Sequence, residues 1–132
     1  MEKYKVVIER ASDGKFWCYT ENCIQNVGLN AEGDSVAEAK KDLMACYEEA
    51  KNDARENGRD FPDVSFEYKY DLRSFFDYFS FLNVSEIAVR AGINPSLMRQ
   101  YTSGVKNAGE STYKRLAACV KNITEELQTA SF

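Results

Sequence analysis

The first half of the chain is dominated by segments in which hydrophobic and polar residues alternate. Residues 3–9, apart from an apolar Val7, and residues 64–70 follow this period of two, which is typical of a strand with one buried face. An aromatic segment at 16–19 follows Asp13-Gly14, a dipeptide that favours a hairpin turn, and a further alternation covers residues 26–31. The pattern therefore predicts three strands near the N-terminus and a fourth much later in the chain.

One long amphipathic helix is predicted between the third and fourth strands. Ser35 and Glu38 form a capping box, in which the serine accepts from a free backbone N–H and the glutamate reaches back to the cap. Asn57-Gly58 ends the helix, because glycine readily adopts the left-handed conformation. Its apolar stripe comprises Val36, Ala39, Leu43, Tyr47, Ala50 and Ala54. Residues 1–70 are therefore predicted to form a small α+β domain, with a three- to four-stranded sheet and one helix.

The second half changes to helical spacing and predicts an all-α domain over residues 71–132. A short aromatic helix at about 72–79 is followed by helices at 84–91 and 95–103, joined by a turn at Gly92. Asn83 and Asn94 are suited to cap these two helices. A last helix is expected to bury a stripe of Tyr113, Leu116, Ala117, Val120, Thr124 and Leu127. The aromatic cluster of Phe75, Phe76, Tyr78, Phe79 and Phe81 is expected to serve as core or as a dimer interface.

Charge divides the chain in the same place. The net charge is −4, but residues 1–70 hold 10 basic and 15 acidic side chains, whereas residues 71–132 hold 7 and 6. Within residues 84–122 the balance is 6 basic against 2 acidic side chains, or +4. This asymmetry indicates two modules with different partners.

Little in the composition points to catalysis, a metal or a cofactor. The chain has no histidine, and its four cysteines form no C-x-x-C pair, so zinc binding and histidine-dependent catalysis are not expected. Carboxylates at Glu9, Glu21, Asp34, Asp42 and Glu49 leave an active nuclease as the weakest alternative, because two-metal chemistry needs them to converge. No apolar run is long enough to span a bilayer and no secretory signal is visible, so we expect a cytoplasmic protein.

Residues 82–127 closely resemble the helix-turn-helix of the Cro and phage-repressor family. The matching features are Asn83, Glu86-Ile87-Ala88, Gly92, Gln100 and Ser103-Gly104, at the family's spacing. The resemblance implies that the helix from Pro95 to Ser103 enters the major groove of DNA. The DNA-contacting residues expected on this basis are Asn83, Asn94, Ser96, Arg99, Gln100, Ser103, Lys106 and Asn107.

Residues 3–70 resemble the HicB antitoxin family. The resemblance is carried by Tyr4, Val7-Ile8-Glu9, Asp13-Gly14, Phe16-Trp17, Gly33-Asp34-Ser35 and Glu38-Ala39. It implies a partial ribonuclease H-like fold without nuclease activity, which binds and inhibits a small RNA-cleaving toxin, HicA. The chain departs from the family where a Pro-Asp-x-x-Gly-Cys turn is usual, since it has Thr20-Glu21-Asn22-Cys23-Ile24 there.

Together the two resemblances predict a type II antitoxin that sequesters a small toxin and represses its own operon. The expected partners are operator DNA, a small HicA-like toxin and a second copy of the chain, because one recognition helix reads few bases. The alternative is a stand-alone helix-turn-helix regulator, whose first domain dimerises or senses a ligand.

Overall fold

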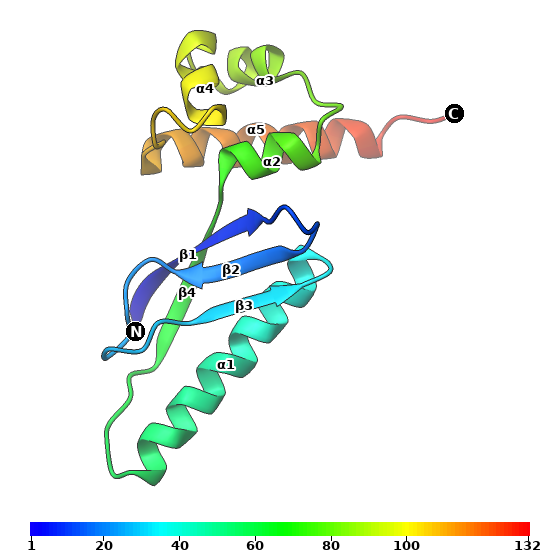
Figure 1. The fold of residues 1–132 in the computed structure, drawn as a ribbon. Helices are drawn as coiled ribbons and strands as arrows, with labels where there is room; N and C mark the ends of the chain where they lie inside the picture. Colours follow the sequence, from blue (N-terminus) through cyan, green and yellow to red (C-terminus); the bar gives the residue numbers. More distant parts are fainter. The chain divides into compact units, whose positions relative to one another are not determined.

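The computed structural model describes residues 1–132 and belongs to the α+β class, with a mixed four-stranded sheet and five helices (Figure 1). The chain divides into two compact units, Met1–Asp71 and Leu72–Phe132. Each unit has its own cluster of buried hydrophobic residues. The two units are therefore described separately.

The sheet of the first unit contains β1 (Glu2–Arg10), β2 (Phe16–Thr20), β3 (Asn30–Gly33) and β4 (Val64–Tyr70), in the order β3-β2-β1-β4. β1 pairs antiparallel with β2, and β2 pairs antiparallel with β3. β4 instead runs parallel to β1, with Glu2 opposite Val64 and Ile8 opposite Tyr70. A parallel connection requires a crossover, which α1 (Val36–Glu56) provides between β3 and β4.

One face of the sheet packs against α1 (Figure 1). The alternation in the strands sends Val6, Ile8, Phe16, Cys18 and Ala31 to that face, all at most 4% exposed. The predicted stripe on α1 is confirmed, since Ala39, Leu43, Tyr47 and Ala54 are buried and Val36 and Ala50 pack partly against the same core. The Tyr47 hydroxyl donates to the Pro62 carbonyl at 2.8 Å, so this buried polar group is satisfied.

Both ends of α1 are capped as the sequence predicts. The Ser35 side chain accepts from the Glu38 backbone N–H at 3.1 Å, as predicted, whereas Glu38 accepts from the N–H of Asp34, one residue before the cap, at 2.9 Å. At the other end Gly58 has φ +70°, and the Arg59 N–H donates to the Ala54 carbonyl at 2.8 Å. This is a Schellman ending, which requires the left-handed residue that glycine supplies.

The third strand is shorter than its hydrophobic alternation predicts. Strand pairing begins at Asn30, whereas residues 24–27 form a tight turn closed by reciprocal hydrogen bonds between Ile24 and Val27. Gln25 and Asn26 both have positive φ, at 46° and 67°, which is the backbone of a mirror-image hairpin turn. The predicted strand over 26–31 is therefore wrong at its start, although Leu29 and Ala31 are buried as expected.

The second unit consists of α2 (Leu72–Tyr78), α3 (Val84–Ala91), α4 (Pro95–Thr102) and α5 (Glu110–Gln128). Its core contains Leu72, Phe76, Ile87, Ala88, Ile93, Met98, Leu116 and Cys119. The aromatic cluster is divided, since Phe76 is buried and Phe75 partly buried, while Tyr78 is 45% and Phe81 82% exposed. No helix in the structure combines the length and apolar character that crossing a membrane would require.

The stripe predicted on α5 is wrong over most of its length. Leu116 and Cys119 are buried and Ile123 is partly buried, whereas Val120 and Leu127 are 37% and 67% exposed. α5 carries two apolar lines at helical spacing, roughly a quarter turn apart. In the structure the line through Leu116, Cys119 and Ile123 packs against the core of the unit, and of the other line only Tyr113 does so.

Candidate nucleic-acid interface

Of the eight residues expected to contact DNA, six either lie in α4 or cap an end of α3 or α4. Asn83 caps the start of α3, and its side-chain oxygen accepts from the Glu86 N–H at 3.1 Å. Asn94 caps the start of α4, and its side-chain oxygen accepts from the N–H groups of Ser96 (2.8 Å) and Leu97 (3.3 Å). Both predicted caps are confirmed, and each leaves its side-chain NH2 group able to donate elsewhere.

The turn between α3 and α4 is a three-residue connection built on a left-handed glycine. Gly92 has φ 72° and ψ 30°, and the Ile93 N–H donates to the Ala88 carbonyl at 2.8 Å. Ala88 has no exposed surface, so only a small side chain fits at that position. The chain therefore leaves α3 in a fixed direction and enters α4 within three residues.

α4 is held against α3 by buried side chains on one of its faces. Met98 is fully buried and Ile93 is 7% exposed, while Tyr101 packs partly against the same cluster. Pro95 occupies the first turn, where its missing N–H costs nothing. α4 ends at Thr102, one residue before the predicted end, and Gly104 follows with φ 82°.

The opposite face of α4 is polar and exposed. Ser96, Arg99 and Ser103 lie on it at spacings of three and four residues. The Arg99 guanidinium donates to the Ser96 hydroxyl at 3.1 Å, and no acidic side chain pairs with it. Gln100 was expected to face outward, but it lies at the edge of this face and is half-buried. This face can donate several hydrogen bonds to a ligand that carries acceptors or negative charge.

Lys106 and Asn107, the last two predicted contact residues, are exposed in the loop after α4. Among the other basic residues of the region, Arg90 pairs with Glu126 at 3.0 Å and Lys114 with Glu110 at 3.6 Å. Neither Arg99 nor Lys106 has such an acidic partner. Positive charge that no acidic side chain of the unit neutralises therefore lies on the exposed face of α4 and in the loop that follows it.

Arg115 has a contact that the sequence does not indicate. Its guanidinium, on α5, donates to the carbonyl of Gly92 in the α3–α4 turn at 2.9 Å. The two residues are 23 positions apart, so no local pattern could have connected them. We interpret Arg115 as a positioning residue, because its bond holds α5 against the turn that sets the direction of α4.

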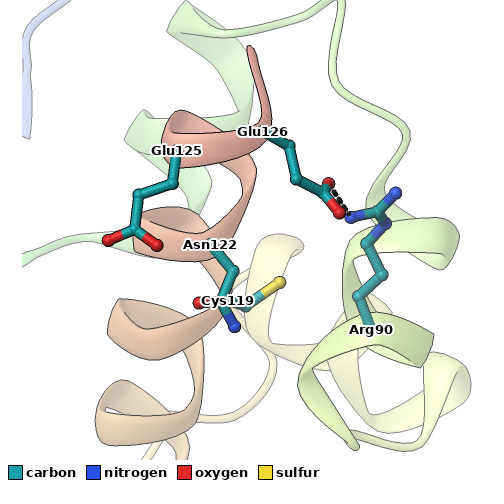
Figure 2. Close-up of a pocket in the computed structure, with 5 residues that line it drawn as sticks. All are labelled: Arg90, Cys119, Asn122, Glu125 and Glu126. Atoms are coloured by element: carbon teal, nitrogen blue, oxygen red, sulfur yellow. Dashed lines mark hydrogen bonds and ion pairs between the residues drawn. The ribbon is translucent and has the colours of Figure 1, made fainter. Parts of the chain in front are cut away.

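A shallow hollow between α3 and α5 is lined by none of the predicted contact residues (Figure 2). Arg90, Cys119, Asn122, Glu125 and Glu126 line it, and the Arg90–Glu126 ion pair closes part of it. The Cys119 thiol lies 3.9 Å from the Ile87 carbonyl oxygen. Besides the Arg90–Glu126 ion pair, the hollow offers the Glu125 carboxylate, the Asn122 amide and the Cys119 thiol, so it holds no cation that is free to bind an anionic ligand.

The carboxylates of the first unit are engaged at separate places. Glu9 accepts from the Tyr19 hydroxyl at 2.7 Å, and burial, reinforced by this bond, raises the pKa of Tyr19. Glu21 pairs with Lys69 at 3.0 Å, and Asp42 accepts from the Glu32 N–H at 3.2 Å. No group of three or more such side chains lies close enough together to hold a metal ion.

The cysteines are all free, and they differ in accessibility. Cys18 and Cys119 are buried, Cys46 is intermediate and Cys23 is exposed. Burial raises the pKa of the Cys18 and Cys46 thiols, which keeps them in the less reactive protonated form.

Comparison with known protein families, with characterised proteins and with solved structures finds no significant match for this chain.

Proposed function

We propose that the chain is an antitoxin of a type II toxin-antitoxin pair, which represses its own operon by binding operator DNA and sequesters a small RNA-cleaving toxin. The observation that carries the DNA-binding part is the α3–α4 pair. Two capped helices of eight residues are joined by a left-handed Gly92, and the second presents a polar face with an arginine that lacks an acidic partner. Two short helices joined by a three- to four-residue glycine turn are the arrangement that places the second helix in a major groove.

The exposed face of α4 has the chemistry that base recognition needs. An arginine can donate two parallel hydrogen bonds to guanine, and a glutamine can pair in the same way with adenine. Arg99 would exchange its bond to Ser96 for such a contact, and Gln100 reaches the groove from the rim of the face. Ser96 and Ser103 are short enough to contact bases or phosphates beside them.

Phosphate contacts would come from residues that flank α4. Lys106 and Asn107 are exposed just beyond its end, and the NH2 groups of Asn83 and Asn94 are available at the starts of α3 and α4. Such contacts fix the register of a protein on the duplex without reading its sequence. Repression would follow from occupation of two half-sites by a homodimer.

The toxin-binding part rests on the resemblance of residues 3–70 to HicB antitoxins. The first unit has its own core and the acidic excess of the chain, which suits a small basic partner. The toxin would be inhibited by steric occlusion of its RNA-binding site. The altered segment Thr20–Ile24 favours the alternative, a stand-alone regulator without a toxin. Co-purification of a small basic protein with the chain, expressed with its neighbouring reading frame, separates these two functions.

The DNA-binding proposal is tested by selecting a preferred duplex from a random-sequence library with the full chain. Gln100→Ala and Arg99→Ala should each lose roughly tenfold or more on the selected duplex and little on a scrambled one, because a bidentate base contact contributes about 1–3 kcal/mol of discrimination. Lys106→Ala is the matched control. It should weaken both duplexes equally and reduce the slope of log affinity against log salt by up to about 0.9.

Failure of the selection to enrich any sequence would remove the operator-binding function. If the wild type prefers one duplex but Gln100→Ala and Arg99→Ala keep that preference, then α4 is not the helix that reads DNA.

A further inference from the structure

The end of α1, which leads into the connection to β4 (Figure 1), contains the one Asn-Gly step of the chain, Asn57-Gly58. In such a step the backbone nitrogen of the glycine can attack the side-chain carbonyl carbon of the asparagine, because glycine has no Cβ to hinder the approach. The chain has nine asparagines, and each of the others precedes a residue that carries a Cβ. Asn57 and Gly58 are both exposed in the structure, so water reaches the reacting atoms.

The folded structure engages both reacting groups in hydrogen bonds of the helix ending. The Asn57 Nδ2 donates to the Asp53 carbonyl at 2.8 Å, which directs the side chain back along the helix. The Gly58 N–H donates to the Arg55 carbonyl at 3.0 Å, so the nitrogen that would attack is also occupied. Ring closure therefore requires the last turn of α1 to open. Residues 55–60 are all exposed, and exposed helix ends open locally at a low cost in free energy.

We propose that Asn57 is the site at which the folded chain deamidates, and that the reaction proceeds when the last turn of α1 frays. The Gly58 nitrogen forms a bond to the Asn57 Cγ, the Cγ–Nδ2 bond breaks, and the amide proton of Gly58 leaves with Nδ2 as ammonia. Water then opens the resulting succinimide ring at either of its carbonyls, which gives aspartate or isoaspartate at position 57. The reaction needs no oxidant or cofactor, and it does not depend on DNA or toxin binding.

Either product weakens the ending of α1. A carboxylate at position 57 has no N–H to donate to the Asp53 carbonyl, and it places a negative charge at the C-terminal end of a helix, where the dipole disfavours it. The Asp53 carboxylate lies beside it, since the Asn57 Nδ2 is 3.5 Å from the Asp53 Oδ1. Isoaspartate also lengthens the backbone by one carbon next to the left-handed Gly58. Deamidation is thus an irreversible change that destabilises the first unit and leaves the second unit unaltered.

The test follows all nine asparagines of the full chain by peptide mass mapping during incubation at mildly alkaline pH, in buffer and in guanidinium chloride. Asn57 should be the first asparagine to convert in both. Its conversion should be about tenfold or more slower in buffer, because the bonds to Asp53 and Arg55 must first open. Gly58→Ala is the control in guanidinium chloride, where no native structure remains. It should slow conversion at position 57 severalfold, because a Cβ hinders ring closure.

Two variants at position 57 test the effect of the product on stability. Asn57→Asp imitates the aspartate product and should lower the ratio of folded to unfolded first unit about fivefold, measured by Trp17 fluorescence in urea. Asn57→Gln is the matched control, because it keeps an uncharged amide and should be destabilised less. It should also show no conversion at position 57 on the same timescale, since its longer side chain does not form the five-membered ring.

Several results would contradict this assignment. Conversion of another asparagine before Asn57 in the folded chain would overturn Asn57 as the site. Equal rates in buffer and in guanidinium chloride would show that the hydrogen bonds of the helix ending give no protection. Conversion in guanidinium chloride but none in buffer would show that the last turn of α1 does not fray. If Asn57→Asp is as stable as the wild type, then the modification does not destabilise the first unit.

Discussion

Gly33, at the end of β3, lies so close to the first turn of α1 that a methyl group cannot be added there. A Cβ atom on Gly33 would be 2.6 Å from the Ala39 backbone nitrogen and 2.6 Å from the Glu38 Cβ. These atoms belong to the helix and cannot rotate away as the end of a flexible side chain could. Gly33→Ala therefore requires β3 and α1 to move apart.

The cost of that movement follows from how firmly both elements are held. The start of α1 is fixed by the Ser35–Glu38 cap, and Ala39 is fully buried beside it. Overpacking of a core typically costs 1–3 kcal/mol, and a contact with backbone belongs at the upper end, so we expect a loss of about 3 kcal/mol. For a unit of this size this corresponds to a fall of about 12 °C or more in melting temperature.

The single tryptophan allows the first unit to be followed by itself. Trp17 is the only tryptophan of the chain and lies half-buried on β2. Urea unfolding of Gly33→Ala monitored by its fluorescence should give a much lower midpoint than the wild type. Gly58→Ala is the matched control. Gly58 has φ +70° and nothing within 4 Å of its Cβ position, so it should cost only about 1 kcal/mol of backbone strain.

The comparison of the two alanine variants tests the close approach of β3 to α1. If Gly33→Ala is destabilised no more than Gly58→Ala, then β3 and α1 do not approach each other as closely as described. The same outcome would remove the steric reason for a glycine between the third strand and the helix cap.

Three further outcomes are expected. Met98→Ala removes a fully buried side chain and should destabilise the second unit by about 2–5 kcal/mol. Circular dichroism melts should show a lower melting temperature for that unit, while the unfolding of the first unit, followed by Trp17 fluorescence, should keep its midpoint. Arg115→Met should lower the stability of that unit by about 1 kcal/mol by removing the bond to Gly92, yet leave the salt slope of DNA binding unaltered. A thiol reagent should modify Cys23 rapidly, and the buried Cys18 only after unfolding.

Local pattern was enough to identify most elements and their ends. The capping residues Ser35, Asn83 and Asn94 could be predicted because a cap is an interaction between neighbours in the chain, and the same holds for the left-handed Gly58 and Gly92. The buried face of α1 was also predictable, because the helix shows one apolar line at its period, whereas on β1 the apolar Val7 interrupts the alternation and is buried as well.

Tertiary structure decided what local pattern leaves open. The sequence predicted β4 as a strand but not its parallel pairing with β1, and it began the third strand at residue 26, which belongs to the turn that Ile24 and Val27 close. α5 carries two apolar lines, and the choice between them depends on the position of its neighbours. Arg115 reaches Gly92 across 23 residues, and the half-burial of Gln100 depends on what surrounds α4. Capping and periodicity act between residues within one or two turns, so sequence determines them directly, whereas the partner of a face is set by packing among distant segments.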